Sequence, residues 1–334
     1  MRSLFKIPLV IWIFLTLVSY ASVLVSPEFF KYSGLIAFSI PIFISVNIIL
    51  TLISILFKWK LGWVSLILSI VAYPFYGVAF GLNKDSVQKK VDLTVLSFNV
   101  KWFSDARKDN YSEVIKWIDS VDADVLCFQE YYPSRDISKR ISDQGKYYES
   151  MDKKTFHVAI YSKFPIIEDG LVFNDQPFNN IRFADLKVGL DTIRIYSAHL
   201  QSMGINPALI QDSEGIQSEY ENVTNKFISG SQGRTLQLKA LIKRANEVSF
   251  PKIIAGDFND VPFSFNYFHL KEKFKNAFEE RGSGFGATYN GKIPYLRIDH
   301  QFFSQGLEIF QFNTEQEIFF SDHYPIIGKY QISH

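Results

Sequence analysis

The sequence predicts an α+β protein in which three transmembrane helices precede a folded domain. Two observations lead to this prediction. The first 82 residues are nearly free of charge and contain three long apolar runs, whereas the rest of the 334-residue chain is mixed in character. After residue 92, segments with the two-residue period of β-strands alternate with segments of helical spacing. We therefore expect a membrane domain over 1–82, a linker over 83–92 and a folded domain over 93–334.

Three segments of the N-terminal region carry no charged residue: 7–27, 33–57 and 61–82. Each is at or above the length of roughly 20 residues that a helix needs to cross a bilayer. Lipid offers no hydrogen-bond partner to the backbone, so helix is the expected state, and Pro74 is expected to kink the third helix. A cleaved signal peptide for the first run and a buried helical core for all three are the alternatives. The two further apolar runs disfavour the signal peptide.

Basic residues at the ends of these segments favour one orientation. Arg2 and Lys6 precede the first segment, and Lys58 and Lys60 separate the second from the third. If these ends are cytoplasmic, the chain after Leu82 lies on the outer face. Three lysines in the linker favour the opposite orientation. We expect a multi-pass membrane protein whose folded domain lies on the non-cytoplasmic side.

Composition narrows the classes of function. The net charge of +1 provides no basic field of the kind that drives tight binding to nucleic acid. The single cysteine, Cys127, lies in an apolar run, which excludes an intramolecular disulfide and a cysteine-rich metal site. No feature of the sequence indicates a protein partner.

The elements of the folded domain are assigned from periodicity and turn residues. Strands are expected over 93–100, 125–128, 157–162, 165–168, 182–188, 192–198, 295–303 and 327–332, with another leading into Asp257. Helices are expected over 111–121, 236–248 and 267–280. Residues 203–232 are predicted to be exposed and partly mobile, and the glycine-rich segment 282–291 is either a substrate loop or a hairpin connection.

Six apolar runs end in polar residues, which turn chemistry alone does not explain. These residues are Asn99, Glu130, His199, Asp257 with Asn259, Asp299, and Asp322 with His323. Polar residues at the same ends of adjacent strands would meet at one edge of a sheet sandwich. Asp257 and Asn259, two positions apart, would share a face of a strand; an Asx-type turn is the alternative.

The chemistry of this set is specific. Carboxylates and an amide, without cysteine, suit a hard divalent cation such as Mg²⁺ or Mn²⁺. The two histidines suit proton transfer or stabilisation of an anion. Zinc is disfavoured because no His/His/acid spacing on one element is present. Ser321, Asp322 and His323 do not form a nucleophilic triad by themselves, because adjacent strand residues point to opposite faces.

The ordered set of short motifs resembles the endonuclease/exonuclease/phosphatase superfamily of metal-dependent phosphoester hydrolases, which share the deoxyribonuclease I-like fold. The matching pieces are Leu96-Ser97-Phe98-Asn99, Phe128-Gln129-Glu130, Ser197-Ala198-His199-Leu200, Gly256-Asp257-Phe258-Asn259, Arg297-Ile298-Asp299-His300 and Ser321-Asp322-His323. The resemblance covers 93–334 and implies a four-layer α/β/β/α sandwich of two mixed sheets. The hydrophobic N-terminal helices look like those of a group of membrane-anchored bacterial members.

The resemblance also implies a role for each position. Glu130 is expected to be the principal metal ligand, and Asn99 and Asp322 are expected to help hold the ion and its waters. His323 would face the scissile phosphate as a base or proton shuttle, oriented by Asp299.

In the same scheme, Asp257 would position or deprotonate the attacking water. Asn259 and His199 would donate hydrogen bonds to the phosphate.

One position departs from the pattern of several nucleases in the family. These carry an acid two residues after the first-strand asparagine, where this chain has Lys101. A second metal ligand there is not expected, and Lys101 is instead a candidate contact for substrate phosphate. Arg182 and Arg297 are further candidates for this contact, with a structural ion pair as the alternative for each. His157, His269 and His300 are expected to be structural or surface residues.

These expectations combine into a membrane-anchored, metal-dependent phosphoester hydrolase of the phosphodiesterase or nuclease type. An alternative is action on a phospholipid or inositol phosphate at the membrane, which tethering would favour. A non-catalytic binding or sensor module on the same fold is the alternative of another class. A channel or transporter is disfavoured because the three apolar segments carry no charged residue to line a polar path.

Overall fold

The chain forms two compact units that are not continuous in sequence. The computed structural model describes residues 6–60, 62–82, 91–104, 111–132, 135–142, 145–151, 157–173, 178–203, 216–291 and 295–333. The first unit comprises 1–79, 203–235 and 261–269, and the second comprises 80–202, 236–260 and 270–334. Most of the predicted linker over 83–92 lies outside the described residues.

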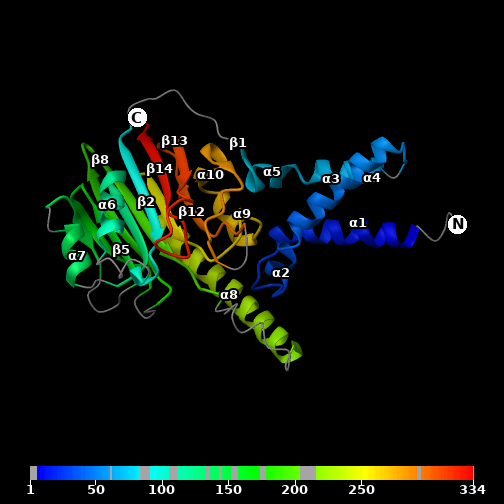
Figure 1. Ribbon diagram of the computed structural model, residues 1–334, viewed down its shortest axis with the longest axis horizontal. Coiled ribbons are helices and arrows are strands. Elements are labelled where there is room, and N and C mark those ends of the chain that lie inside the picture. The colour runs from blue at the N-terminus through cyan, green and yellow to red at the C-terminus, as the bar shows by residue number, and fades with distance from the viewer. Residues whose placement is uncertain are drawn as a thin grey trace. The chain divides into compact units, whose positions relative to one another are not determined.

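The second unit is built on two six-stranded mixed sheets (Figure 1). The first sheet has the order β13 (Leu307–Thr314), β14 (Ile326–Ile332), β2 (Leu93–Asn99), β3 (Val125–Tyr131), β5 (His157–Ser162) and β4 (Tyr148–Ser150). The second has the order β10 (Lys275–Asn276), β12 (Asp299–Phe303), β9 (Lys252–Asp257), β8 (Asp191–His199), β7 (Ile181–Val188) and β6 (Ile166–Leu171). Within these two sheets, β2 with β3 and β8 with β9 are the parallel pairs.

Apolar side chains from the facing sides of both sheets form the central core. Val95 and Ile160 of the first sheet pack in one cluster with Ile195 and Ile253 of the second. Each of these four side chains is fully buried, as expected when alternate strand residues face an opposing sheet.

Helices cover the outer faces of the two sheets. Val114 and Ile118 of α6 (Ser112–Val121) pack on the first sheet with Leu96 and Phe98, and α7 (Arg135–Ser142) joins the same cluster. On the second sheet, the C-terminal part of α8 (Ile216–Ala245) reaches β6, where Arg244 Nη2 lies 3.3 Å from Glu168 Oε1. The four-layer sandwich expected from the resemblance is therefore confirmed.

Two buried glutamines link the sheets through hydrogen bonds. Gln129 Nε2 on β3 donates to Ser197 Oγ on β8 at 3.0 Å. Gln301 Nε2 on β12 donates to the carbonyl oxygen of Val95 on β2 at 3.1 Å, and Tyr330 donates to Gln301 Oε1 at 2.7 Å. These bonds fix the relative register of the two sheets across an otherwise apolar core.

The largest departure from the predicted elements is α8, a helix of 30 residues. Its last ten residues fall within the predicted helix over 236–248. The segment 203–232, predicted to be exposed and partly mobile, is helical from residue 216 onward, and residues 204–215 lie outside the described residues. The buried side of α8 includes Ser231, Arg234, Thr235 and Gln237, each at most 3% exposed. Buried polar residues interrupt the apolar period, so the sequence pattern did not reveal the part of this helix before residue 236.

Smaller departures occur near the C-terminus. The single helix predicted over 267–280 is divided into α9 (Phe265–Lys271) and α10 (Ala277–Arg281). Asn276 separates them, because its side-chain oxygen accepts hydrogen bonds from the backbone of Phe278 and Glu279 and so begins a new helix. β12 begins at Asp299 rather than at residue 295, and β13 was not predicted.

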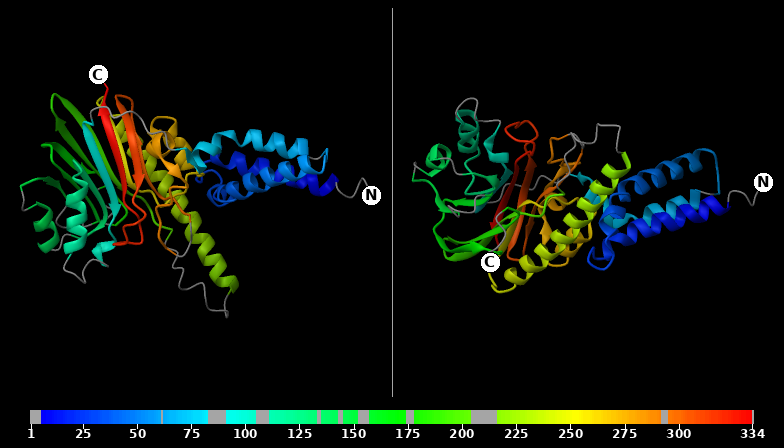
Figure 2. Two further views of the ribbon diagram at one scale, coloured as in Figure 1. Left: turned by 45° about the horizontal axis from the view of Figure 1, so that its top comes forward. Right: turned by 90° about the horizontal axis from the view of Figure 1, so that it is seen from below.

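The first unit contains the apolar N-terminal helices α1 (Lys6–Ala21), α2 (Ser33–Ala37), α3 (Ile40–Leu56), α4 (Gly62–Val71) and α5 (Tyr73–Ala79). α1, α3 and α4 lie side by side (Figure 2). Among the described residues, 7–24 and 33–56 are long and apolar enough to cross a membrane. α4 and α5 add a third candidate if this pair, bent by 64°, is one span. Pro74 follows the bend directly, in agreement with the predicted kink.

The N-terminal part of α8 also belongs to the first unit. Phe227 of α8 packs edge-on against Phe38, with ring centroids 5.1 Å apart. Gln232 Nε2 donates to the carbonyl oxygen of Pro27 at 3.2 Å. The apolar N-terminal helices are thus joined to a segment from the middle of the chain.

A buried histidine makes stability depend on pH. His300 is 2% exposed and packs against Phe258 and Phe302, and burial lowers its pKa to about 3. Since an unfolded histidine has a pKa of about 6.5, unfolding takes up a proton between these two values. The contribution of neutral His300 to the free energy of unfolding is fully present above about pH 6.5. It is lost, by up to about 1.4 kcal/mol per pH unit, as the pH falls toward the pKa of the folded state.

His300→Gln removes this titration. We expect the unfolding midpoint of the variant to fall less steeply than that of the wild type between about pH 6.5 and about pH 4. The measurement is denaturant or thermal unfolding of the full chain in detergent. His199 titrates in both proteins, so the difference reports His300 alone. Parallel pH profiles would contradict this assignment.

Candidate active site

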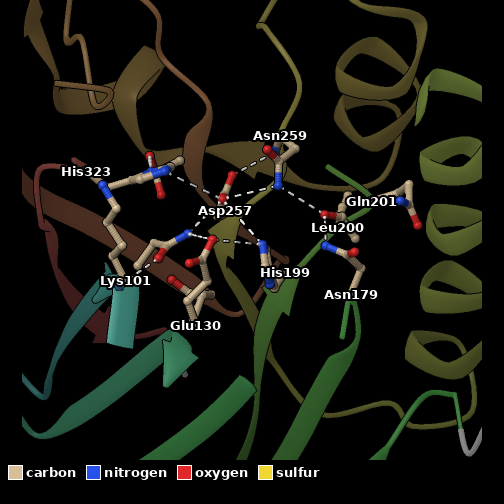
Figure 3. A network of polar contacts seen from close by, with 12 residues as sticks. Lys101, Glu130, Asn179, His199, Leu200, Gln201, Asp257, Asn259 and His323 are labelled. Carbon is tan, nitrogen blue, oxygen red and sulfur yellow. Dashed lines mark hydrogen bonds and ion pairs between the residues drawn. The ribbon is translucent and has the colours of Figure 1, made fainter. Parts of the chain in front are cut away.

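The polar strand ends of the second unit meet at one edge of the two sheets (Figure 3). Asn99 ends β2, His199 ends β8 and Asp257 ends β9. Asp299 begins the antiparallel strand β12 directly opposite Asp257. His323 lies just before β14, which runs antiparallel to β2. Parallel strands end, and antiparallel strands begin, at the same edge of a sheet, so the predicted convergence is observed.

A close approach of two strands supports this edge. Gly256 has φ +151°, and a Cβ atom at this position would lie 1.9 Å from the carbonyl oxygen of Ala198. Glycine is therefore required where β9 passes β8 immediately before Asp257.

Asp257 lies at the centre of the network and is 1% exposed. Asn99 Nδ2 donates to Asp257 Oδ2 at 3.0 Å, and Asn259 Nδ2 donates to the same oxygen at 3.2 Å. The backbone N–H of Asn259 donates to Asp257 Oδ1 at 2.8 Å. β9 ends at Asp257 and Asn259 has φ +49°, so an Asx-type turn, rather than strand alternation, places the two side chains together.

Two histidines face Asp257, one from the end of β8 and the other from the segment before β14. His199 Nε2 lies 3.7 Å from Asp257 Oδ2 and 3.8 Å from Glu130 Oε1. His323 Nε2 lies 3.9 Å from Asp257 Oδ2, and its Nδ1 lies 2.9 Å from Asp299 Oδ2. Asp299 therefore orients His323, while the other contacts exceed hydrogen-bond length.

The surroundings shift the pKa values of the two histidines in opposite directions. Burial alone would lower the pKa of His323, but the charges of Asp299 and Asp257 raise it to about 10. Burial lowers the pKa of His199 to about 4. Burial also raises the pKa of Asp257, against the opposing charge of His323. At neutral pH His323 is a proton donor, and His199 is a neutral imidazole.

A more exposed group of charges borders this buried centre. The side chains of Glu130 and Asp322 are 30% and 31% exposed. Asn99 Nδ2 donates to Glu130 Oε1 at 3.3 Å, and Lys101 Nζ lies 2.9 Å from Asp322 Oδ2. Asn99 Oδ1 accepts from the backbone of Lys101 at 3.1 Å. Asn99 thus directs its NH₂ group, rather than its oxygen, toward the carboxylates.

Among the residues that the structure describes, two groups offer ligands for a metal ion. Asp257, Asp299 and His323 have ligand atoms within 4.8 Å of one another. This trio is buried, and His323 Nδ1 is already paired with Asp299 Oδ2. Glu130 and Asp322 fit a hydrated hard cation better, because they offer oxygen ligands and are open to water.

Arg182 and Arg297 have structural partners in the described residues. Arg182 Nη1 donates to Ser150 Oγ and to Asp169 Oδ2, both at 3.0 Å. The guanidinium of Arg297 lies 3.6 Å from the ring centroid of Phe278 and donates to the carbonyl oxygen of Phe285. The structure therefore favours the ion-pair or packing alternative for these two residues over phosphate binding.

Several supporting residues escaped the sequence analysis. Thr288 Oγ1 accepts from the backbone N–H groups of Ile298 and Asp299, both at 3.0 Å, and so fixes the start of β12. Tyr289 pairs with His323 in an isolated β-bridge. Both lie within the glycine-rich segment 282–291, which was the one signal for them. Gln129 was visible as a polar residue inside an apolar run, directly before Glu130.

Comparison with solved structures identifies similar folds. The structure of D. rerio TDP2 complexed with single strand DNA product has a TM-score of 0.54 and 18% identity, covering 72% of this chain and 98% of that one. The Bacteroides thetaiotaomicron mannosyl-6-phosphatase Bt3783 has a TM-score of 0.52 and 17% identity, with coverage of 72% and 100%. The human Nocturnin catalytic domain with bound sulfate has a TM-score of 0.53 and 13% identity, with coverage of 72% and 93%. These identities establish likeness of fold alone.

Sequence comparison identifies the family. No curated protein matches the chain. A family described as a domain of unknown function, DUF8431, matches residues 2–78. The Endonuclease/Exonuclease/phosphatase family matches residues 96–323, which is more than half of the chain and includes every strand end of the site. The chain therefore belongs to the Endonuclease/Exonuclease/phosphatase family.

Proposed function

We propose that the chain is a divalent-metal-dependent hydrolase of phosphoester bonds, anchored in a membrane by its N-terminal helices. Membership of the family supports hydrolysis at the general level. One observation carries the proposal. Asp257 faces His323, which Asp299 orients, and the more exposed carboxylates of Glu130 and Asp322 border this buried centre. A buried acid, a proton donor and oxygen ligands for a cation are the parts that this reaction needs.

Asp257 and His323 would each carry out one of the two proton transfers of the hydrolysis. Asp257 would take the proton of the attacking water as the water oxygen bonds to phosphorus. His323 would give a proton from Nε2 to the leaving oxygen as the phosphorus–oxygen bond breaks. His199 and Asn259 would donate hydrogen bonds to the non-bridging oxygens; Asn259 would redirect one N–H that now bonds to the carbonyl oxygen of Leu200 at 3.0 Å.

Glu130 and Asp322 would hold Mg²⁺ or Mn²⁺, and Asn99 would fix Glu130 through its NH₂ group. A bound divalent ion would neutralise charge that develops on the phosphate oxygens. Lys101 forms an ion pair with Asp322. It would either keep balancing the negative charge of this carboxylate or, once a metal ion binds Asp322, move to the phosphate.

Two substrate classes remain candidates. A phosphodiester of the nucleic-acid type is the leading one, and the TDP2 neighbour is complexed with single strand DNA product. The candidate spans favour a phospholipid or inositol phosphate instead, because tethering raises the effective concentration at a bilayer. We propose 1–82 as the membrane domain and 93–334 as the catalytic domain, on the outer face as the basic residues before and between the spans indicate.

Single substitutions test the catalytic roles. Glu130→Ala, Asp257→Ala and His323→Ala should each lower the rate of bis-nitrophenyl phosphate hydrolysis by at least about 10²-fold, the scale of one positioned group. Asn259→Asp should cost at least as much as Asn259→Ala, because a second carboxylate would repel both Asp257 and the phosphate. Glu308→Ala, on the exposed side of β13, is the matched control. Wild-type rates in the first three variants would refute the assignment.

Metal dependence is measured separately. Chelation should abolish activity of the full chain, and Mg²⁺ or Mn²⁺ should restore it. Glu130→Gln should raise the Mn²⁺ concentration for half-maximal binding by at least about tenfold, measured by electron paramagnetic resonance. An unchanged Mn²⁺ affinity would show that Glu130 is not a ligand.

Membrane anchoring is tested by extraction. The full chain should remain in the membrane fraction at high salt and at alkaline pH, and detergent should release it, because apolar spans and not charges hold it. Release by salt alone would show that the N-terminal helices do not cross the bilayer.

A further inference from the structure

Four aromatic rings form a contiguous group in the second unit: Trp102, Tyr132, His157 and Phe178, here called the aromatic group. Trp102 and His157 meet edge to face, with centroids 4.7 Å apart at 87°. His157 and Phe178 lie 4.6 Å apart at 44°, and Trp102 and Tyr132 lie 6.3 Å apart at 53°. The rings come from four separate segments of the chain, so the tertiary fold assembles them.

Three members of the aromatic group are next to residues of the catalytic centre along the chain or in the sheet. Trp102 follows Lys101, whose backbone N–H donates to Asn99 Oδ1. Tyr132 lies two residues after Glu130. His157 begins β5 and pairs with Tyr131, the residue directly after Glu130.

The backbone beneath the group adopts costly conformations. Lys101, Trp102 and Phe103 have φ values of +43°, +60° and +50°, and none of them is glycine. A left-handed residue of this kind costs roughly 1–2 kcal/mol. Phe103 is 1% exposed in the core, which holds the turn in place. Backbone strain that the surrounding packing enforces is typical of residues that contact a ligand.

Two rings of the aromatic group, those of Phe178 and Tyr132, are open to solvent, whereas His157 is 9% exposed. Phe178 is 61% exposed and Tyr132 is 46% exposed. Burial lowers the pKa of His157, so this ring is neutral at neutral pH and does not repel an apolar ligand. Exposed aromatic faces beside a catalytic centre are a ready surface for stacking.

We propose that the aromatic group binds a planar ring carried by the substrate next to the scissile phosphate, so that the preferred substrates are nucleotide-type phosphodiesters. This rests on the proposed function and names its substrate class. Rings tilted at 44° to 87° offer a face and an edge together, which complements a flat base. The imidazole within the group adds a hydrogen-bonding atom that suits the polar edge of a base and not an acyl chain.

Two esters with one leaving group test this proposal: thymidine 5′-(4-nitrophenyl phosphate) and methyl 4-nitrophenyl phosphate. The wild-type full chain in detergent with Mg²⁺ should prefer the nucleoside ester in kcat/KM by at least about tenfold. Phe178→Ala and Tyr132→Ala should each lower kcat/KM for the nucleoside ester by about five- to a hundredfold, chiefly through KM. Both substitutions should change kcat/KM for the methyl ester by less than about twofold.

Tyr148→Ala is the matched control, since Tyr148 is 53% exposed on the edge strand β4. Equal effects of Phe178→Ala on both esters, or none on either, would overturn the proposal. Loss confined to an ester bearing a long acyl chain would show that the group binds lipid and would overturn it as well.

A binding measurement separates this proposal from the proposed function. If the wild type hydrolyses neither ester, the proposed function fails, and equilibrium dialysis with thymidine 5′-monophosphate still tests the aromatic group. Phe178→Ala should then weaken binding of thymidine 5′-monophosphate at least about fivefold and leave binding of inorganic phosphate unchanged. Equal affinity of variant and wild type for thymidine 5′-monophosphate would refute the proposal.

Discussion

The burial of one carboxylate, that of Asp257, is the constraint on which the site depends. A carboxylate removed from water is costly unless donors and positive charge surround it. Asn99 and Asn259 supply the donors, and His323 supplies the charge. Asn99 and His323 come from distant parts of the sequence, so the carboxylate holds together segments from both sheets. The same burial that requires these partners also raises the pKa of Asp257, which suits it to accept a proton.

The two sheets keep this edge rigid. Gln129 and Gln301 cross the apolar core and join the sheets by hydrogen bonds, and Gly256 allows the backbone of β9 to pass close to Ala198. Side chains that lie on strand ends are therefore held by the core and not by mobile loops. The exposed carboxylates of Glu130 and Asp322 remain accessible on this rigid edge, which separates a site for a hydrated cation from the dry centre.

The residues of the catalytic centre and the residues proposed to select the substrate lie on different segments of the chain. The residues at the strand ends lie in the short motifs that resemble the family, whereas the aromatic group combines the strained turn at Trp102, the start of β5 and two segments outside the strands. Loops that border a fixed centre can vary without disturbing it, which is how one fold acts on different phosphoesters. The N-terminal helices add a further element, because they place the same chemistry near a bilayer in the proposed function.

The sequence by itself determined the strand ends, their polar residues and the apolar N-terminal segments, because period, turn residues and hydropathy are local properties. It also indicated the family through motifs in order. Only the tertiary structure revealed the part of α8 before residue 236, where buried polar and apolar residues are mixed, and the turn that pairs Asn259 with Asp257. Tertiary structure alone also placed Arg182 and Arg297 with structural partners and assembled the aromatic group, because such contacts join residues that are distant in sequence.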